Sequence, residues 1–442
     1  MHTPRISFTA AGDMLIQRRI PPAYEGRDPV DAFIRRGEAR FFNLETTLHR
    51  GGHYGNYFNG GSYLRADPGI LQVARDYGFN MLSFANNHTF DFGYGGLEDT
   101  LRAVTDAGFV HAGVGMNLDE AALPAYLELP RGRVALIATA STMASPNNYA
   151  AMAGRQSRTV PGRPGVNGLR LDERIEVTPE QFGFLRQLID ESGVNVYNNI
   201  LRKEGYVTTA PSEDEIPLGD AMTFFRGEQT RYRTLLNEED MARIGRSITE
   251  AKAQADYILV SIHAHELAGD SKETPGEFLV EFAHRCIDLG AHAVLGHGPH
   301  LLRPLEIYRG RPIFYSLGDF VLHNESMRSA PEEMYAMQGL TSDAPICEVF
   351  RLRSAGYTRG LLCDRRMMES VIPWFEMEDG QLRRMELLPV ALGIEQPRYR
   401  SGNPFFAPDR GILERLAEMS APYGTRITIG PDGIGAVEWE EV

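Results

Sequence analysis

The segment AHAVLGHGPH, residues 291–300, gives the clearest indication of both a fold and a site. The mostly apolar run at 291–295 is typical of a buried strand, with His292 as its one polar member. Two histidines, His297 and His300, follow the run. Ligands of α/β proteins bind beyond the carboxyl ends of the strands, and imidazoles there serve as metal ligands or acid–base groups. The alternative is a loop with two surface histidines, and the rest of the chain must decide between the two interpretations.

The composition limits the function classes. The chain has 442 residues, enough for one large or two ordinary domains, and its 43% hydrophobic content supports a substantial core. The formal net charge of −14 argues against a nucleic-acid-binding protein and, more weakly, against an anionic membrane surface as partner. An acidic chain can still contain a basic pocket, and a bound metal ion would supply local positive charge.

The sequence shows no targeting or disulfide pattern. Its three cysteines are scattered and odd in number, which does not suit a closed disulfide framework. Residues 1–13 lack the basic and apolar regions of a signal peptide. No run of about 18 apolar residues predicts a transmembrane helix. We therefore expect a cytoplasmic protein without stable membrane insertion, and the sequence leaves the oligomeric state open.

Strand-like and helix-like segments alternate over much of the chain, which predicts an α/β fold with buried strands. Asp67 is an expected helix N-cap, and Gly78 and Gly290 are expected helix ends. The expected strands are 6–11, 40–44, 79–85, 109–112, 123–129, 134–140, 256–261, 291–295, 305–308 and 312–316, and the expected helices among them are 67–77, 97–107 and 276–289.

Two regions depart from this pattern. Residues 141–170 are rich in Pro, Gly, Asn and Arg, so we take about 141–250 as an inserted segment or lid, with helices at 180–190 and 237–255. Residues 1–325 would form the catalytic domain, and 326–442 a β-rich extension packed on the same core. In that extension we expect hairpins at 370–389, over an Asp-Gly turn, and at 425–439, with a helix at 411–419.

Five predicted strands end in side chains that bind hard or borderline metals. Because strand ends of an α/β sheet gather along one edge, these groups should converge in space. Their oxygen and imidazole donors suit Mn²⁺, Fe²⁺, Zn²⁺ or Mg²⁺ and suffice for two ions. The expected chemistry is hydrolysis by a metal-activated water, with a nearby histidine protonating the leaving group. The strand ends are Asp13, Glu45, Asn87 with His88, the run His263 to Glu266, and His297 with His300.

The ordered motifs resemble those of one family. They are GDML (12–15), FFNLET (41–46), FANNHTFDFG (84–93), SIHAHE (261–266), GHGPH (296–300) and RGRPIFYSLGDF (309–320). Together they resemble the capsule-biosynthesis protein A (CapA, poly-γ-glutamate biosynthesis) family of the calcineurin-like metallophosphoesterase superfamily. The resemblance implies a four-layer α/β/β/α sandwich with a dimetal site at one edge.

The resemblance also implies roles for individual residues. Asp13 matches the aspartate that binds one metal, Glu45 stands at the bridging carboxylate, and Asn87 matches the ligand of the second metal. His88 matches the catalytic histidine, and His263 and His300 match two further histidines of the pattern.

Three positions depart from the family pattern. Leu15 stands where the superfamily usually has a histidine, which removes a ligand. Gly298 stands where many relatives have a histidine, and His297 lies one residue earlier. Asp319 replaces an asparagine and adds a carboxylate.

These observations lead to one assignment of roles. We expect a metal-dependent hydrolase that cleaves a phosphoester or an amide, such as a γ-glutamyl or peptide-like bond, in a small or polymeric anionic substrate. The alternative is a non-catalytic accessory protein of capsule or poly-γ-glutamate biosynthesis that binds a polyanion. The expected catalytic residues are His88 and His265, the metal ligands are Asp13, Glu45, Asn87, His263, His297 and His300, the substrate contacts are Glu266, Asp319 and Arg163, and the cofactors are two divalent ions, Mn, Fe or Zn.

Overall fold

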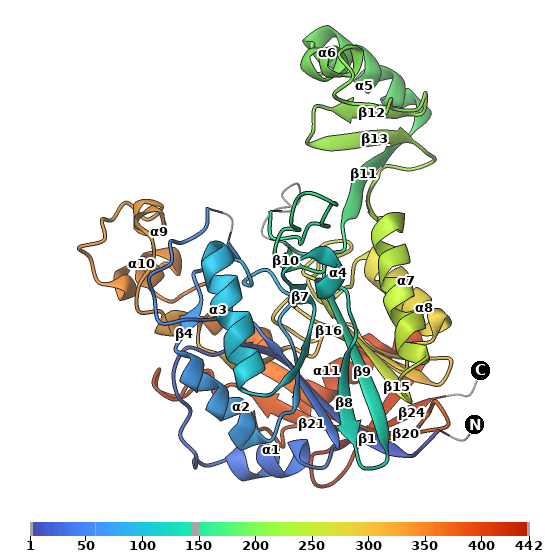
Figure 1. Cartoon of the computed structure of the whole chain (residues 1–442). Helices are drawn as coiled ribbons and strands as arrows, with labels where there is room; N and C mark the ends of the chain where they lie inside the picture. Colours follow the sequence, from blue (N-terminus) through green and yellow to red (C-terminus); the bar gives the residue numbers. More distant parts are fainter. Residues whose placement is uncertain (1–2, 58, 144–149, 440–442) are drawn as a thin grey trace.

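Two β-sheets that lie against each other form the centre of the protein (Figure 1). The computed structural model describes residues 3–57, 59–143 and 150–439. Within them the larger sheet has ten strands, in the order β23-β24-β21-β20-β1-β2-β5-β6, with β19 beside β1 and β22 beside β21. The smaller has six, in the order β17-β18-β16-β15-β9-β8. The predicted α/β class is therefore confirmed.

The strands of these two sheets come from both halves of the chain. Strands β20 and β21, near the carboxyl end, lie in the same sheet as β1. The larger sheet contains β1 (Ile6–Leu15), β2 (Ala39–Leu44), β5 (Met81–Ser83), β6 (Val110–Ala112), β19 (Asp319–Leu322), β20 (Glu369–Glu378), β21 (Gln381–Ala391), β22 (Phe405–Phe406), β23 (Thr425–Ile429) and β24 (Gly435–Trp439). The smaller contains β8 (Ala125–Leu129), β9 (Gly132–Ala140), β15 (Tyr257–His263), β16 (Ala293–His297), β17 (Leu305–Tyr308) and β18 (Arg311–Phe314).

Helices cover outer faces of these sheets. Helices α7 and α8 pack on β9, β15 and β16, and α1 packs on β20 and β21. The α-helices are α1 (Arg27–Ile34), α2 (Leu71–Tyr77), α3 (Gly93–Asp106), α4 (Leu118–Ala121), α5 (Pro179–Ser192), α6 (Val196–Lys203), α7 (Glu238–Lys252), α8 (Glu277–Leu289), α9 (Glu332–Ala336), α10 (Ile346–Arg353) and α11 (Gly411–Ser420). Short 3₁₀ turns are η1 (Pro68–Ile70), η2 (Asn324–Ser326), η3 (Leu361–Cys363), η4 (Arg365–Met368) and η5 (Ala421–Tyr423).

Strand β9 shows why the predicted strands of the smaller sheet are continuously apolar. Val134, Leu136 and Ala138 belong to the core between the two sheets. Ala135 and Ile137 point the other way, into the core shared with α7 and α8. Because successive side chains of a strand alternate between faces, a strand covered on both faces needs apolar residues at every position.

A separate four-stranded sheet with two helices projects from the body of the protein (Figure 1). It has the strand order β12-β13-β11-β14, and α5 packs on β12 and β13. The division of the chain at 325 and the insertion at about 141–250 stay predictions. The strands of this four-stranded sheet are β11 (Leu171–Val177), β12 (Glu215–Leu218), β13 (Met222–Arg226) and β14 (Arg231–Leu236). Two-stranded pairs elsewhere in the described chain are β3 (Thr47–Leu48) with β4 (Arg65–Ala66), and β7 (Val114–Gly115) with β10 (Gly165–Val166).

Local signals for helix ends and turns are confirmed. The Asp67 carboxylate accepts a hydrogen bond from the backbone N–H of Gly69, as an N-cap does. Gly78 ends α2 with φ of 92°. Asp379 and Gly380, between β20 and β21, have φ of 55° and 72°, which is the backbone of a two-residue hairpin turn.

Several strands run further than the sequence predicts. Strand β1 continues to Leu15, and β15 and β16 include His263 and His297. The prediction ended these strands at residues 11, 261 and 295, but backbone pairing continues for at least two more residues: Asp13 pairs with Asn43 and Asp319, and His263 pairs with His297. Asp13, His263 and His297 therefore lie on strands. Glu45, Asn87 and His300 follow strand ends, as the sequence predicts.

In the described parts of the chain, no helix combines the length and the apolar character needed to cross a membrane.

Gly12 allows a close approach of the chain next to Asp13. An added Cβ at Gly12 would overlap the carbonyl oxygen of Gly318, which also accepts a hydrogen bond from the N–H of Asp13. We predict that Gly12→Ala lowers the free energy of unfolding by about 1–3 kcal/mol in urea titrations, the range typical of overpacking. The control is Gly183→Ala on α5, where a Cβ meets open space and should stabilise by about 0.5–1 kcal/mol. Equal effects of the two substitutions would contradict this account.

Candidate metal centre

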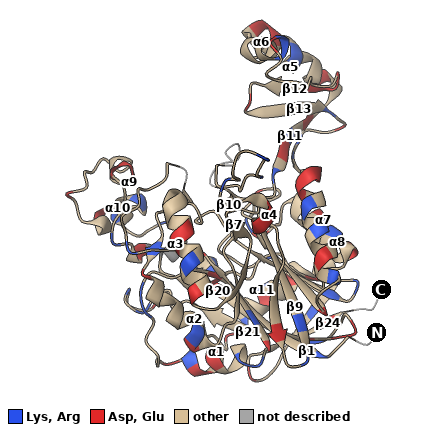
Figure 2. Cartoon of the chain, in the orientation of Figure 1, with Lys and Arg blue, Asp and Glu red and all other residues tan. Residues whose placement is uncertain are grey.

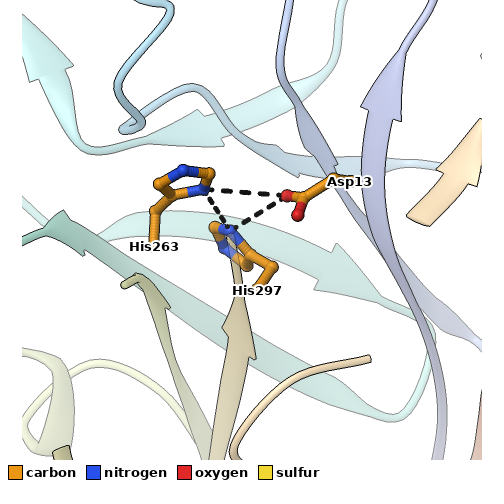
Figure 3. Close-up of side chains that lie close together, drawn as sticks. All are labelled: Asp13, His263 and His297. Atoms are coloured by element: carbon orange, nitrogen blue, oxygen red, sulfur yellow. Dashed lines mark hydrogen bonds and ion pairs between the residues drawn. The ribbon is translucent and has the colours of Figure 1, made fainter. Parts of the chain in front are cut away.

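Neighbouring strands of both sheets direct polar side chains into one buried volume. Between the pairs Ala10–Phe41 and Asp13–Asn43, β1 contains one more residue than β2. Such a bulge re-aims the side chains that follow it. From the smaller sheet, His263 on β15 and His297 on β16 reach the same volume as Asp13 (Figure 3).

Asp13, His263 and His297 form the first group of possible metal ligands. Oδ1 of Asp13 lies 3.3 Å from Nδ1 of His297 and 3.7 Å from Nδ1 of His263. The two histidine Nδ1 atoms are 3.0 Å apart. Oδ2 of Asp13 accepts a hydrogen bond from the N–H of Gly298 at 2.7 Å, so Oδ1 is the oxygen turned toward the imidazoles.

Glu45 lies next to this group and is fully buried. Its Oε1 is 3.7 Å from Nε2 of His263, 3.9 Å from Nε2 of His88 and 4.0 Å from Nε2 of His300. Neither carboxylate oxygen has a hydrogen-bond partner among the described residues. A buried carboxylate without partners is strongly destabilising, so the arrangement calls for a cation.

Two other buried oxygens are in the same condition. Oδ1 of Asn87 and Oδ2 of Asp319 lack hydrogen-bond partners in the described part of the chain. Three sets of side chains have ligand atoms within 4.8 Å of one another, and adjoining sets share Asp13 or His263. Carboxylate, amide and imidazole donors suit a divalent ion of the Mn, Fe or Zn kind. The residues therefore fit a metal, and the sets are Asp13–His263–His297, Glu45–His263–His265 and Asp13–His300–Asp319.

Further hydrogen bonds orient the histidine rings. Nδ1 of His88 is 2.7 Å from Oδ2 of Asp91, whose oxygens also accept the N–H groups of Gly60 and Leu64. Nε2 of His297 is 2.7 Å from the hydroxyl of Ser261. Carboxylates and hydroxyls on the far nitrogen are the usual supports of metal-binding imidazoles.

His300 is held by its backbone as well as by its ring. It has φ of 61°, in the left-handed region that few residues other than glycine adopt. Its Nδ1 lies 2.9 Å from Oδ1 of Asp319, which leaves Nε2 directed toward Glu45. Backbone strain at such a residue persists only where the surroundings impose it.

The pKa values of the buried groups in this cluster are shifted in different directions, because each group has different charged and hydrogen-bonding neighbours. Burial would raise the pKa of Asp13, but the hydrogen bonds of His263 and His297 outweigh it and hold that pKa well below its usual range. Burial, together with the carboxylates of Asp13 and Asp319, raises the pKa of Glu45 well above its usual range. Burial also raises the pKa of Asp319 to about 6 and lowers that of His263 to about 4. A neutral His263 is the form that binds metals.

Two of the predicted substrate contacts have protein partners. Glu266 accepts hydrogen bonds from the hydroxyls of Ser141 and Thr142, at 2.8 and 3.0 Å. The exposed Arg163 donates to the carbonyl of Met152 at 3.2 Å. The structure therefore places Glu266 beside His265 with both carboxylate oxygens hydrogen-bonded, and it places Arg163 between β9 and β10.

The sequence interpretation missed two supporting residues. Asn43 donates to Oδ1 of Asp13 at 2.7 Å, and its position inside the motif FFNLET was the available signal. The guanidinium of Arg303 is buried and donates to the backbone carbonyls of Ala264, His265 and Glu266. Burial lowers the pKa of Arg303 to about 10. No motif marks Arg303, because its partners are carbonyl groups that every residue has.

Glu45 supports a prediction whose sign depends on the metal. In chelator-treated protein the raised pKa of Glu45 means that stability falls as pH rises above the unfolded-state pKa of a glutamate. Glu45→Gln should therefore raise the melting temperature of the metal-free protein at pH 8 and change it little at pH 4. In protein loaded with Mn²⁺ or Zn²⁺ the same substitution should lower the melting temperature, because a ligand is lost. A stabilising effect that is the same with and without metal would contradict the ligand role of Glu45.

Comparisons with known proteins show the family to which the chain belongs. The family model described as bacterial capsule synthesis protein PGA_cap matches residues 7–324, which include the candidate ligands. An uncharacterized protein of Sinorhizobium fredii, y4sH, is 32% identical over 98% of this chain and 92% of its own length. The PGA biosynthesis protein CapA of Bacillus subtilis is 24% identical over 72% of this chain and 66% of its own. A protein of Mycobacterium tuberculosis named as a probable polyglutamine synthesis accessory protein is 28% identical over 63% and 54%. The resemblance drawn from the motifs is thus confirmed: the chain belongs to the bacterial capsule synthesis protein PGA_cap family.

Proposed function

We propose that the chain is a metal-dependent hydrolase with the four-layer sandwich and dimetal site of the metallophosphoesterases. The observation that carries the proposal is Glu45, whose two oxygens are buried without hydrogen-bond partners in the described structure while three histidine Nε2 atoms lie 3.7–4.0 Å from one of them. A purely structural carboxylate would have acquired donors at such a position.

The proposed ligands form two groups, one for each metal ion. Asp13, His263 and His297 would hold one ion, and Glu45, Asn87 and His300 would complete the site for a second. Bound Mn, Fe or Zn lowers the pKa of a coordinated water and stabilises negative charge that develops on the substrate. The two buried carboxylates, Asp13 and Glu45, balance the charge of the ions.

His88 is proposed as the general acid. Asp91 holds Nδ1 of His88 at 2.7 Å, which leaves Nε2 facing Glu45 and available to deliver a proton to the leaving group. His265 is less suited to that role, because its Nε2 is 3.0 Å from Nε2 of His263 and belongs to a possible ligand set. We assign His265 to the metal site or to its immediate surroundings.

The roles proposed for the remaining residues follow from their hydrogen bonds. Asp319 binds the ring of His300 through Oδ1, so its main task is to orient that ring. Glu266 fixes Ser141 and Thr142 beside the site. Arg163, between β9 and β10, remains a proposed contact for an anionic substrate.

The substrate class rests on the family and on the site together. The metal chemistry suits a phosphoester or an amide, including a γ-glutamyl or peptide-like bond, in a small or polymeric anion. The names of the relatives add capsule and poly-γ-glutamate biosynthesis as the setting, and we propose a cytoplasmic location. One of those names contains the words accessory protein, so the second candidate is a protein that binds a polyanion at the metal site without cleaving it.

Two substitutions separate chemistry from metal binding. His88→Ala should lower kcat about 10²- to 10⁴-fold, the usual contribution of a general acid, with metal content unchanged. Asp13→Ala should reduce the metal content itself. Metal is quantified by inductively coupled plasma mass spectrometry, and hydrolysis is followed on a panel of phosphoesters and γ-glutamyl peptides. The control is His111→Ala, since His111 is a half-buried histidine whose ring is hydrogen-bonded to Thr105.

The same panel decides between the two candidates. A metal-loaded protein that cleaves no member of the panel but binds poly-γ-glutamate would favour the accessory role. Full activity of both His88→Ala and Asp13→Ala would refute the assigned site.

A further inference from the structure

A cavity outside the candidate metal centre is lined by several arginines. Its volume is about 590 Å³, within the range of ligand pockets. Among the described lining residues, five are arginines and one, Asp67, is an acid. The arginines are Arg18, Arg19, Arg50, Arg65 and Arg328, and Gln17 lies beside them.

The charge of this lining is opposite to that of the chain. Five guanidinium groups against one carboxylate leave a net charge of +4, with His49 counted as neutral, whereas the whole chain carries −14. Helix α7, by contrast, contains both acidic and basic residues (Figure 2). A collection of one sign in a concave surface concentrates the field on a ligand of the opposite sign.

Protein carboxylates neutralise little of this charge. Asp67 pairs with Arg50 at 3.1 Å, but both side chains are mostly exposed, so solvent screens the pair. Arg65 donates to the hydroxyl of Ser329 and Arg18 to the carbonyl of Ser401, and both of these acceptors are uncharged. Several guanidinium groups therefore face the cavity without a charged partner among the described residues.

The lining also includes a histidine, His49, whose ring is neutral. The backbone N–H of Gly51 donates to Nδ1 of His49, which puts the proton of the neutral ring on Nε2. His49 is buried, and its Nε2 has no hydrogen-bond partner in the described part of the chain. Burial and the charge of Arg65 lower the pKa of His49 to about 4, so the ring stays neutral at neutral pH. His49 therefore adds no positive charge to that of the arginines.

We propose that this cavity binds a linear oligoanion that carries two or more carboxylate or phosphate groups. The planar guanidinium of arginine matches both kinds of group with paired hydrogen bonds, and five arginines around one cavity exceed the needs of a single small anion. This inference rests on the residues of the cavity and stands whether or not the metal centre is catalytic.

Short stretches of chain connect residues of the cavity with residues of the candidate metal centre. Gln17 follows Asp13 by four residues and His49 follows Glu45 by four, so each lies within about 14 Å of the residue that it follows. Arg65 follows Leu64, whose N–H donates to Asp91. An oligoanion in the cavity would therefore be held near the metal centre by groups that take no part in the chemistry.

Calorimetric titration of the protein as purified tests the proposal with two probes, sodium tripolyphosphate and γ-linked tetraglutamate. The variant is the double substitution Arg19→Gln with Arg328→Gln, because both side chains are exposed and their loss leaves the core intact. The control is Arg246→Gln, an exposed arginine on α7 outside the cavity.

We expect the double variant to bind at least one of the two probes with an affinity at least about tenfold lower than that of the control. We also expect affinity to fall when salt is raised from about 0.05 to 0.5 M, because salt screens exposed charges. Tripolyphosphate alone would identify phosphate as the ligand group, and tetraglutamate alone would identify carboxylate.

Two results would overturn the proposal. One is the absence of binding of either probe at low salt. The other is equal affinity of the double variant and the control, with binding abolished by chelation, since that pattern places the anion on the metal ions.

Discussion

Glu45 is a carboxylate enclosed by protein with no hydrogen-bond partner among the described residues, and much of the surrounding structure can be understood from that constraint. An isolated buried charge destabilises a fold by several kcal/mol, so it persists where something else compensates it. Here the ring nitrogens of His88, His263 and His300 surround one of its oxygens at 3.7–4.0 Å. These distances are too long for hydrogen bonds and leave room for cations between the groups.

The two sheets provide the rigidity that such a cluster needs. Asp13 and His263 lie on strands whose backbones are paired on both sides, so neither side chain can leave the cluster without disrupting a sheet. Supporting contacts come from further residues: Asn43 and Gly298 bind Asp13, and Arg303 holds the backbone that carries His265. A site built on strands in this way is more precise than one built on loops.

The sequence predicts the α/β class, and it names strand-end residues of which the structure brings Asp13, Glu45, His88, His263, His297 and His300 close together. One polar donor after an apolar strand is unremarkable, but five in one chain indicate a site, because the sheet brings strand ends together. The exact ends of the strands could not be predicted, because pairing of β1 with β2 and β19 carries Asp13 into the sheet although its side chain is polar. Helix α3 begins at Gly93, earlier than the glycines at 93, 95 and 96 suggested, because tertiary packing overrides their weak helix propensity.

The contacts that join distant parts of the chain could not be predicted from the sequence. Arg303 binds carbonyl groups, which leave no mark in the sequence. The arginine cavity draws on residues from Arg18 to Arg328, and only the folded chain brings them together. Local patterns predict what a segment becomes, whereas a pocket depends on which segments meet.

Anomalous X-ray scattering from crystals of the protein, recorded at the Mn, Fe and Zn absorption edges, tests the central claim most directly. We predict anomalous density between Glu45 and the group of Asp13, His263 and His297, with at least one carboxylate oxygen of Glu45 in its coordination sphere. A map without such density, in crystals grown with these metals, and with Glu45 hydrogen-bonded only to water would contradict the claim that this carboxylate is buried to bind metal.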